Sequence, residues 1–389
     1  MLCTTEEKVK MKETKRHFDA VVVGLGKTGI SCVRYLLNKD LKIAVTDSRM
    51  DPPGLSMLKT ECTSVPVFLG EINAEILLSS DQIILSPGVS LNNEAVKQAI
   101  ANGIPVFGDI EIFCQQAKAP IIAISGSNGK STVTTLITEM TRQAGLKTSV
   151  GGNLGTPALD LLNEDIPDIY VLELSSFQLE TTFSLNAHAS VVLNISSDHM
   201  DRHTNLPEYI NVKKKIYSGN GLMVINKDDD AVKAMDDNSR QSISFTLNRP
   251  EKNNFGIIIK NNEVWLCQGD NKIIRQDELG IKGEHNVANA LAAIALATSM
   301  NVPFDSMIKT LKSFSGLEHR CQRVARIKKI DWFNDSKATN IGACIASIKS
   351  LCVLGKIILI AGGDSKGANL SILTPIITKY VRHVLLLGV

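Results

Sequence analysis

The chain has 389 residues, of which 44% are hydrophobic, and a formal net charge of +2. That length allows two or three domains, each with a sizeable core. Acidic and basic residues are scattered and nearly balanced, which excludes the basic surface typical of nucleic-acid-binding proteins and gives no charged face for a membrane surface.

The first residues, MLCTTEEKVKMKETKRHF, mix acids and bases without an apolar run, so they do not predict a signal peptide. No apolar run elsewhere approaches the roughly 20 residues of a membrane-spanning helix. The eight cysteines occur singly, without a CxxC pair or the spacing of a zinc site, which indicates reduced thiols. We therefore expect a cytoplasmic protein that inserts into no membrane and binds no nucleic acid.

Apolar runs rich in β-branched residues alternate with helix-like segments along most of the chain. This alternation predicts an α/β fold with largely parallel sheets. The predicted strands lie at residues 20–24, 42–46, 82–88, 120–125, 169–174, 190–196, 223–229, 356–363 and 383–389. Between about Ser242 and Gly280, short strand-like pieces joined by Asn, Gly and Asp predict a small antiparallel patch appended to the middle domain. Differences between the loops place domain boundaries near Ala119 and Gly316, so that we expect domains at residues 1–118, 119–316 and 317–389.

The first predicted strand is followed by Gly24, Gly26 and Gly29, which match the GxGxxG pattern, and Asp47 ends the next strand. In this pattern a phosphate approaches the helix N-terminus, and an acidic residue about 20 positions on accepts a hydrogen bond from a ribose or a base. The pattern alone is a weak signal, because the glycines could serve only a tight turn. A nicotinamide cofactor, a flavin and a nucleotide-sugar all remain open at this point.

The segment APIIAISGSNGKSTVTT runs from a predicted strand through a glycine-bearing turn into a helix start. Two residues separate Gly126 from Gly129, where the usual phosphate loop has four. Backbone N–H groups from Gly126 to Lys130 would surround terminal phosphates, the Lys130 ammonium would neutralise their charge, and the Ser131 hydroxyl would ligate Mg²⁺. The alternative is a turn that merely opens an ordinary helix.

Two further segments place polar side chains after apolar strands. Glu173 ends one such strand, and a buried carboxylate is costly unless it is functional or held in a structural salt bridge. In NISSDHMDRH, His199 and His203 stand four positions apart, flanked by Asp198 and Asp201, which could form half of a zinc site. No third ligand follows at a fixed spacing. A single His or Asp beside a magnesium–phosphate centre therefore fits this segment better.

The segments GSNGKST, ELSSFQLE, DHMDRH, GEHNVANALAA, GLEHRCQRV and NDSKATN occur in the order found in the Mur ligases of bacterial peptidoglycan synthesis, and nearly the whole chain resembles that family. The segments GLGKTGISC, SPGV and GDIEIFC are similar to the branch that adds D-glutamate. The resemblance implies a Rossmann-like N-terminal domain for a uridine nucleotide, a central P-loop ATPase-like domain and a Rossmann-like C-terminal domain. It also implies an ATP- and Mg²⁺-dependent acid–amino-acid ligase, a monomer, whose substrates are UDP-N-acetylmuramoyl-L-alanine and D-glutamate.

In such a ligase the γ-phosphate of ATP passes to a substrate carboxylate, and an amine then attacks the acyl phosphate. The family's catalytic roles would fall on Lys130, Glu173, His199, Lys213 and Lys337. The ATP-binding positions would be Gly126, Ser127, Asn128, Gly129, Lys130, Ser131, Thr132, Asn286, Arg320 and Asp335. One Mg²⁺ would be held by Ser131 and Glu173, and a second, bridging phosphate and acyl group, by His199 and Lys213.

The resemblance also implies where the two other substrates bind. The uridine nucleotide would contact Thr28, Asp47, Ser48, Arg49, Ser86, Pro87 and Gly88. The muramoyl end would contact Asn153 and His199, and the incoming D-glutamate would contact Lys337 and Thr339.

Lys213 belongs to a run of three lysines, which usually indicates a solvated helix surface. Tyr209, Lys213 and Tyr217, however, have the i, i+4, i+8 spacing of a single helix face. The family resemblance places at this position a lysine carbamylated by CO₂, an anion that would orient the second Mg²⁺. We therefore hypothesise that Lys213 is carbamylated, with a lowered pKa that favours the reactive uncharged amine.

Three alternatives remain open. Another ligase of the superfamily, such as another Mur step or a folylpolyglutamate synthase-like enzyme, would share the middle domain, and an NAD-linked oxidoreductase would explain only GLGKTG. The chain also ends on the apolar run HVLLLGV, about halfway through the third domain, after Asp364 and Lys366 near the family's interdomain contacts. A truncated homologue that binds UDP-substrate and ATP but ligates poorly is therefore the third alternative.

Overall fold

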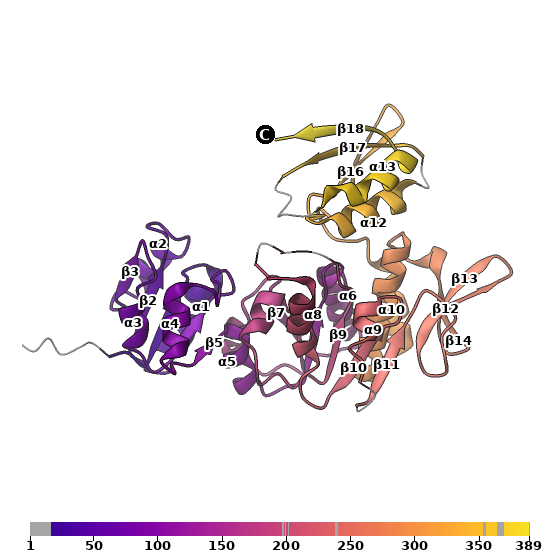
Figure 1. Ribbon diagram of the computed structural model, residues 1–389. Coiled ribbons are helices and arrows are strands. Elements are labelled where there is room, and N and C mark those ends of the chain that lie inside the picture. The colour runs from indigo at the N-terminus through magenta and orange to yellow at the C-terminus, as the bar shows by residue number, and fades with distance from the viewer. Residues whose placement is uncertain are drawn as a thin grey trace, which may run out of the picture. The chain divides into compact units, whose positions relative to one another are not determined.

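The structure of the protein, a computed structural model, describes residues 17–196, 198, 200, 202–237, 240–352, 355–363 and 369–388. The chain divides into two compact units, the first ending at Asp109 and the second beginning at Ile110 (Figure 1). Both units alternate strands and helices, so the predicted α/β fold is confirmed. No helix in the described part of the chain is long and apolar enough to cross a membrane.

The first unit is built on a parallel five-stranded sheet with the strand order β3-β2-β1-β4-β5. Its central strand β1 is buried along its whole length, which explains its continuous apolar sequence. The order reverses between β1 and β4, and ligands of such sheets bind beyond the carboxyl ends of the strands at this reversal. The elements are β1 (Ala20–Val23), α1 (Lys27–Leu37), β2 (Ile43–Asp47), α2 (Leu55–Glu61), β3 (Val67–Leu69), α3 (Ala74–Leu78), β4 (Ile83–Leu85), α4 (Glu94–Ala101) and β5 (Val106–Phe107).

The second unit contains a nine-stranded sheet with the order β14-β13-β12-β11-β10-β9-β6-β8-β7. Six strands that are neighbours in this sheet are parallel to one another: β11, β10, β9, β6, β8 and β7. β6, which leads into the phosphate loop, lies between β9 and β8. The first elements are α5 (Asp109–Gln116), β6 (Ile121–Ser125), α6 (Lys130–Gln143), β7 (Thr148–Gly152), η1 (Ala158–Asn163), β8 (Ile169–Glu173), α7 (Ser176–Glu180), β9 (Ala189–Val192), α8 (Leu206–Lys214) and η2 (Lys215–Tyr217). They are followed by β10 (Leu222–Asn226), α9 (Asp230–Lys233), β11 (Ser242–Phe245), β12 (Phe255–Lys260), β13 (Glu263–Gln268), β14 (Asn271–Arg275), η3 (Gln276–Glu278), α10 (Glu284–Ser299) and α11 (Phe304–Ser313).

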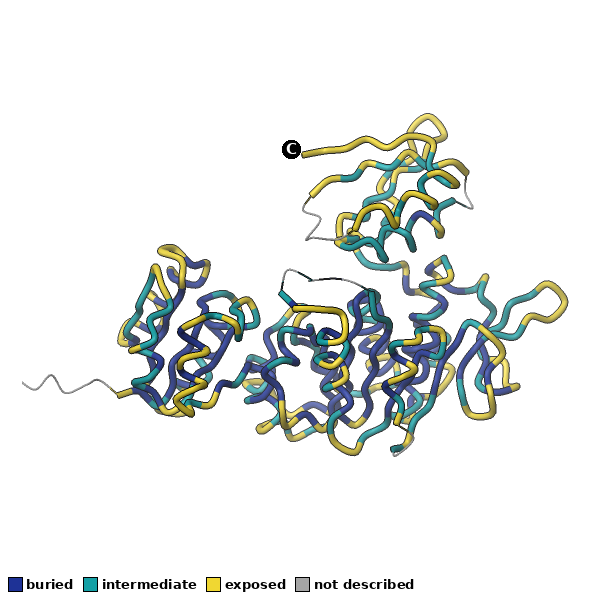
Figure 2. Tube along the Cα trace, in the orientation of Figure 1, coloured by how far each residue is buried: buried dark blue, intermediate teal, exposed yellow. Residues whose placement is uncertain are grey.

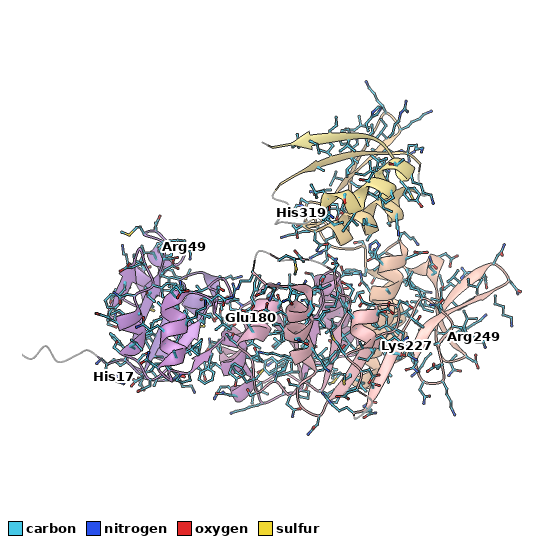
Figure 3. All side chains as sticks on the ribbon, in the orientation of Figure 1. His17, Arg49, Glu180, Lys227, Arg249 and His319 are labelled. Carbon is cyan, nitrogen blue, oxygen red and sulfur yellow. The ribbon has the colours of Figure 1, made fainter. Side chains whose placement is uncertain are left out.

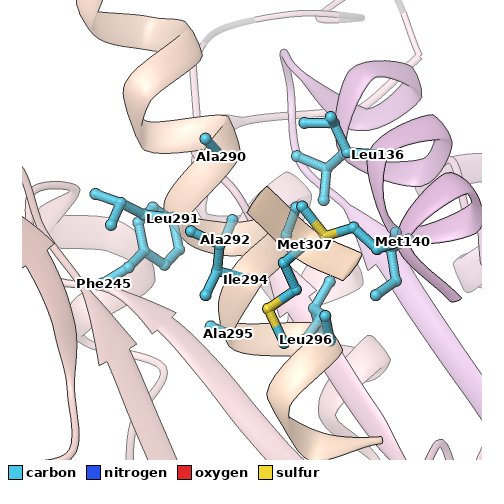
Figure 4. Close-up of a cluster of buried hydrophobic side chains, with 14 of the residues drawn as sticks. Leu136, Met140, Phe245, Ala290, Leu291, Ala292, Ile294, Ala295, Leu296 and Met307 are labelled. Atoms are coloured by element: carbon cyan, nitrogen blue, oxygen red, sulfur yellow. The ribbon is translucent and has the colours of Figure 1, made fainter. Parts of the chain in front are cut away.

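The hydrophobic core of this sheet is organised around helix α10. Its residues from Ala290 to Ala297 are all buried, so the helix is apolar on every side, as expected of a helix enclosed by its neighbours. In the core cluster of Figure 4, Leu291 of α10 lies beside Phe245 of β11, while Leu136 and Met140 of α6 and Met307 of α11 lie toward the other side of α10. This packing fixes α6, the helix that follows the phosphate loop.

The chain continues with a hairpin of β15 (Gln322–Ile327) and β16 (Ile330–Asn334), which the sequence did not predict. Next come α12 (Ile341–Leu351), β17 (Ile357–Gly362), η5 (Leu370–Leu373), α13 (Thr374–Tyr380) and β18 (Val381–Leu387). β17 and β18 pair in parallel. Most of β18 is exposed, including Leu386 at 79% and Leu387 at 65% (Figure 2).

All nine strands expected from apolar runs are present, as β1, β2, β4, β6, β8, β9, β10, β17 and β18. The antiparallel patch is also present, but it begins later in the chain than predicted. β11, beginning at Ser242, pairs in parallel with β10, and the antiparallel pairing starts only at Phe255. The patch, β12 to β14, is joined to the edge of the central sheet through β11, as predicted for an addition to the middle domain. The expected boundaries at Ala119 and Gly316 stay predictions.

Candidate active site

The phosphate loop joins β6 to α6, and its two glycines adopt conformations that other residues rarely take. Gly129 has a φ of +85°, and a Cβ on it would lie 2.4 Å from Oδ1 of Asn289. A Cβ on Gly126, with φ of +145°, would lie 3.0 Å from Cβ of Leu193. Both positions therefore require glycine. The loop therefore lies close to the segment that follows β9 and to α10.

Lys130 begins α6 and folds back over this loop. Its Nζ donates to the carbonyl oxygens of Gly126 and Ser127, each at 2.9 Å. Burial lowers the pKa of Lys130, which the carboxylates of Glu173 and Asp198 partly counteract. The ammonium is thus placed at the helix N-terminus, where phosphates bind.

Ser131 and Glu173 converge as the sequence predicted. Oγ of Ser131 donates to Oε2 of Glu173 at 2.8 Å, and Nδ2 of Asn153 donates to Oε1 at 2.7 Å. Glu173 is 2% exposed. The pair forms because β6 and β8 are parallel neighbours whose carboxyl ends share one edge. The alternative of a structural salt bridge at Glu173 finds no support, since both carboxylate oxygens accept from neutral groups.

The chemistry of this pair fits Mg²⁺. A hydroxyl and a carboxylate are hard oxygen ligands, and their 2.8 Å separation is about that of neighbouring oxygens at 2.0–2.1 Å from one octahedral ion. Among the described residues, no cluster of three His, Cys, Asp or Glu side chains is arranged to hold a metal. Mg²⁺ commonly takes one or two protein ligands and completes its shell with water and substrate phosphates.

Lys213 is buried, so the solvated-surface alternative is wrong. Its side chain is 2% exposed, and its Nζ donates to the carbonyl oxygen of Gly126 at 3.0 Å and to Oγ of Ser125 at 3.3 Å. Burial lowers its pKa well below the usual range, and the nearby Lys130 ammonium lowers it further. Tyr209 is buried on the same helix, α8, whereas Tyr217 is buried in the 3-10 helix η2 that follows, so the three residues do not share one α-helix.

A cleft of about 1100 Å³ lies beside the phosphate loop. Its walls include seven of the predicted positions: Asn128, Gly129, Thr132, Asn286, Arg320, Asp335 and Lys337. Arg320 also reaches the pair formed by Ser131 and Glu173, because its Nη2 donates to Oγ of Ser131 at 2.9 Å. Segments distant in sequence therefore meet at one cavity, which is large enough for a nucleotide.

The two residues predicted to contact D-glutamate are both exposed. Thr339 is exposed and is not part of the cleft wall, while Lys337 lies on the wall with an exposed side chain. His199, Asp201, Asp364 and Lys366 lie outside the described residues. His203 is 1% exposed, stacks on Phe177 and meets Oγ of Ser176 at 3.0 Å, which accounts for it as a packed core residue.

The predicted uridine-nucleotide residues lie at the carboxyl edge of the first unit's sheet. Oγ of Ser86, after β4, donates to the carbonyl oxygen of Gly24, after β1, at 2.7 Å. The strand order reverses between these strands. The remaining members also follow β1, β2 or β4: Thr28, Asp47, Ser48, Arg49, Pro87 and Gly88.

Asp47 organises this edge. Its carboxylate accepts from the Leu25 backbone N–H at 2.7 Å and from the Arg49 guanidinium at 2.7 and 2.9 Å. Burial alone would raise its pKa, but these hydrogen bonds outweigh burial and lower the pKa to about 2. Arg49 itself is labelled in Figure 3 and is half exposed. Asp47 thus fixes Arg49 in place at the edge.

The site includes residues that the sequence did not identify. Asn289 of α10 contacts the loop at Gly129, Asn194 accepts from the Asn128 backbone N–H at 2.8 Å, and Asn340 bonds the Asn128 side chain. Neutral amides carry no charge pattern that would have singled them out. Asn340, at the end of NDSKATN, could have been noted from its motif.

Family models and similar proteins agree with this architecture. A model described as "Mur ligase MurD-like, N-terminal domain" matches residues 18–108, and one described as "Mur ligase middle domain" matches residues 124–297. A UDP-N-acetylmuramoylalanine--D-glutamate ligase from Nitrosococcus oceani is 47% identical over 369 residues, which are 95% of this chain and 82% of that protein. The same-named protein of Pseudomonas syringae pv. tomato is 48% identical over 370 residues, with the same coverage of both chains.

Solved structures share the fold at low sequence identity. The UDP-N-acetylmuramate-alanine ligase MurC of Thermotoga maritima matches with a TM-score of 0.60 and 17% identity, covering 95% of this chain and 85% of that one. A pseudomurein peptide ligase type C from Methanothermus fervidus matches with a TM-score of 0.57 and 20% identity, covering 95% and 88%. These two similarities concern the fold alone.

Proposed function

The chain belongs to the Mur ligase family, and on that premise we propose that it is an ATP-dependent ligase that joins D-glutamate to UDP-N-acetylmuramoyl-L-alanine in peptidoglycan precursor synthesis. The relatives that are 47% and 48% identical bear the name of this activity. The observation that carries the proposal is the convergence of Lys130, Ser131, Glu173 and Arg320 beside one nucleotide-sized cleft.

The reaction needs activation, because a carboxylate is a poor electrophile at neutral pH. A carboxylate oxygen of UDP-N-acetylmuramoyl-L-alanine attacks the γ-phosphorus of ATP, and the bond to the β–γ bridging oxygen breaks, which gives an acyl phosphate and ADP. The amine of D-glutamate then attacks the acyl carbon, inorganic phosphate leaves, and the amine loses a proton. Two easier steps thereby replace one prohibitive step.

In this proposal the chain's own residues bind and orient the triphosphate. The N–H groups of Ser127 and Asn128 donate to Asn194, so the N-terminus of α6 would face the phosphates, and the Lys130 ammonium would leave the two loop carbonyls to meet them. Arg320 lies within reach of the same region through Ser131. Asn286 and Asp335 line the cleft and would contact the nucleotide.

Mg²⁺ would be held by Ser131 and Glu173, and when bound it would offset the negative charge of the phosphates. Asn153 would fix the orientation of the Glu173 carboxylate through their 2.7 Å hydrogen bond. Asn153 is also exposed, so it would be accessible to the muramoyl end of the substrate.

Two further roles are part of the proposal. Lys213, with its buried and easily deprotonated amine, would react with CO₂ to form a carbamate that, with His199, orients a second Mg²⁺. Lys337, at the cleft wall, and Thr339 would meet D-glutamate. The carboxyl edge of the first unit would hold the uridine nucleotide, with Arg49 fixed by Asp47.

We also propose that the enzyme acts as a monomer in the cytoplasm. The seven cysteines among the described residues are all free, which suits a reducing compartment.

The proposal is tested by mixing the chain with Mg²⁺-ATP, UDP-N-acetylmuramoyl-L-alanine and D-glutamate, and measuring ADP release and product mass. ADP release that requires both substrates, with a product heavier by one glutamate residue, is the expected result. Release with L-alanine or a diamino acid in place of D-glutamate would assign the chain to another step of the family. No release with any acceptor, although nucleotide binds, would support the poorly ligating alternative.

A further inference from the structure

Asn340 makes more contacts than its place in the helix requires. It is the N-cap of α12, where its Oδ1 accepts from the Ala343 backbone N–H at 2.9 Å. The same side chain forms a reciprocal amide pair with Asn128 of the phosphate loop, at 3.0 and 3.2 Å. Its Nδ2 also donates to Oδ2 of Asp198 at 3.0 Å. One side chain thus joins α12, the phosphate loop and the segment after β9.

Asn128 is itself held firmly by the segment after β9. Its backbone N–H donates to Oδ1 of Asn194 at 2.8 Å, and its carbonyl oxygen accepts from Nδ2 of Asn194 at 3.0 Å. Its Nδ2 also approaches Oγ of Ser196 at 3.4 Å. The backbone N–H groups of Ser127 and Asn128 both donate to Asn194, so Asn128 serves the framework of the loop.

The first turn of α12 packs directly against this loop. A Cβ on Gly342 would lie 3.2 Å from Oγ of Ser196 and 3.4 Å from Nδ2 of Asn128. Glycine at this position leaves the space that lets Asn340 reach the loop. Two residues before Asn340, Ala338 lines the ATP cleft, as does Lys337.

We propose that Asn340 is a positioning residue that locks the segment Asp335–Thr339 onto the phosphate loop and onto Asp198, so that ATP and the amino-acid-binding residues are held in one arrangement. The proposal rests on the proposed function for its catalytic consequence. A capping role alone does not explain an asparagine here, because aspartate, serine and threonine cap helices about as well. Only an amide caps the helix and donates to two acceptors at once.

The substitution Asn340→Asp separates the two roles. Aspartate keeps the cap but loses both donated hydrogen bonds, and its carboxylate faces that of Asp198 at close range, where like charges repel. Asn73→Asp is the matched control, because Asn73 caps α3 through its Oδ1 in the first unit and belongs to no part of the ATP site. In the double variant Asn340→Asp/Asp198→Asn, the new amide at position 198 can donate to the new carboxylate at position 340, which reverses the direction of the parent hydrogen bond. Asp198→Asn alone serves as its reference.

Two measurements test the proposal. Hydrogen exchange of the ligand-free protein should become about tenfold faster in the peptide covering Asp335–Thr339 in Asn340→Asp, and should return toward the parent rate in the double variant. The kcat/KM for D-glutamate should fall roughly 10- to 100-fold in Asn340→Asp, because buried acceptors lose their partners. The melting temperature should change no more than it does in Asn73→Asp.

The double variant should keep more activity than the product of the two single effects predicts, which is the sign of a direct interaction. The proposal is overturned if Asn340→Asp exchanges and ligates like the Asn73→Asp control, or if the two single effects simply multiply in both measurements. If the parent chain fails to ligate D-glutamate, the proposed function fails. The exchange comparison needs no ligand and still decides whether Asn340 locks the segment.

Discussion

The ammonium group of Lys213 lies against the phosphate loop, where its Nζ donates a 3.0 Å hydrogen bond to the carbonyl oxygen of Gly126. No acidic side chain forms an ion pair with it among the described residues, although Asp198 and Glu173 act on it over longer distances. A buried lysine so placed reduces the stability of the fold, and its retention points to a chemical role.

Lys213→Met should therefore raise or preserve the melting temperature at pH 7 while it abolishes most of the ligation. The unfolded lysine keeps its proton to about pH 10.4, whereas the folded lysine, with a lowered pKa, releases it earlier. Between those two pKa values the unfolded state binds more protons, so the stability of the parent rises with pH in that window. The variant should lack this rise. Urea unfolding at several pH values measures it, with exposed Lys214→Met as the control.

The carbamate hypothesis adds a second experiment at the same position, with the variant Lys213→Ala. A short-chain carboxylate should restore part of the activity of Lys213→Ala by supplying the missing anion. An intact mass of the active parent that shows no added CO₂, together with no rescue by any carboxylate, would remove the carbamate from the proposed function.

Lys130→Ala should lower the ligation rate by about a hundredfold or more, since a preorganised charge contact with the transferring phosphoryl group contributes roughly 3 to 4 kcal/mol. The fold should be little affected, because the ammonium bonds only carbonyls of its own loop. Steady-state rates and thermal melting measure the two effects, with Lys147→Ala, which removes an exposed ion pair, as the control. A rate within a few-fold of the parent would contradict the role given to Lys130.

Glu173→Gln should raise the Mg²⁺ concentration needed for half-maximal activity by about tenfold or more, because a neutral amide oxygen replaces a carboxylate ligand. Removal of Mg²⁺ with a chelator should abolish ligation in both proteins. The measurement is the rate against free Mg²⁺ at saturating ATP. An unchanged Mg²⁺ requirement would show that Glu173 holds no metal.

Asp47→Asn should destabilise the first unit by about 2 kcal/mol at pH 7. This energy follows from the difference between the pKa of Asp47 in the folded protein, about 2, and its ordinary value of 3.8. The folded pKa is depressed, so this stabilisation is present above pH 4 and is lost as the pH falls through about 2. The difference between parent and variant in urea unfolding should fall to about half by pH 3. A difference that stays constant down to pH 3 would exclude the Asp47 carboxylate as its source.

UDP-N-acetylmuramoyl-L-alanine should raise the melting temperature of the chain by mass action, since it binds the folded state alone, while NAD⁺ should leave it unchanged. A concentration series of each compound in thermal melting is the measurement. A clear shift with NAD⁺ and none with the UDP-sugar would overturn the assignment of the first unit's carboxyl edge.

The sequence could predict contacts that follow from local patterns on neighbouring strands. Ser131 and Glu173 meet because each follows or ends an apolar strand, and parallel strands of one sheet end at one edge. Tyr209 and Lys213 are four positions apart, so helical periodicity likewise predicts that they lie on one face of the helix, which is buried. The run of three lysines, however, is also compatible with a solvent-exposed Lys213.

Other features depend on the fold as a whole. Asn128 and Asn340 are separated by 212 positions, and neutral amides carry neither a charge pattern nor a periodic signal. The strand Gln322–Ile327 is largely exposed and carries two arginines, so it lacks the apolar run by which the other strands were identified. The pairing of β11 was mistaken because short strands rich in Ser and Phe do not reveal the direction of their neighbour.

The two units have separate hydrophobic clusters that share no residue, one confined to positions 18–106 and the other to positions 122–317. The chain passes from one unit to the other only once, after Asp109. This arrangement has a consequence for heredity. A genetic crossover at that junction would exchange the first unit as a whole and leave the hydrophobic cluster of the second unit unchanged. A recombined chain can therefore carry a different first unit without any change to the core that supports the phosphate loop.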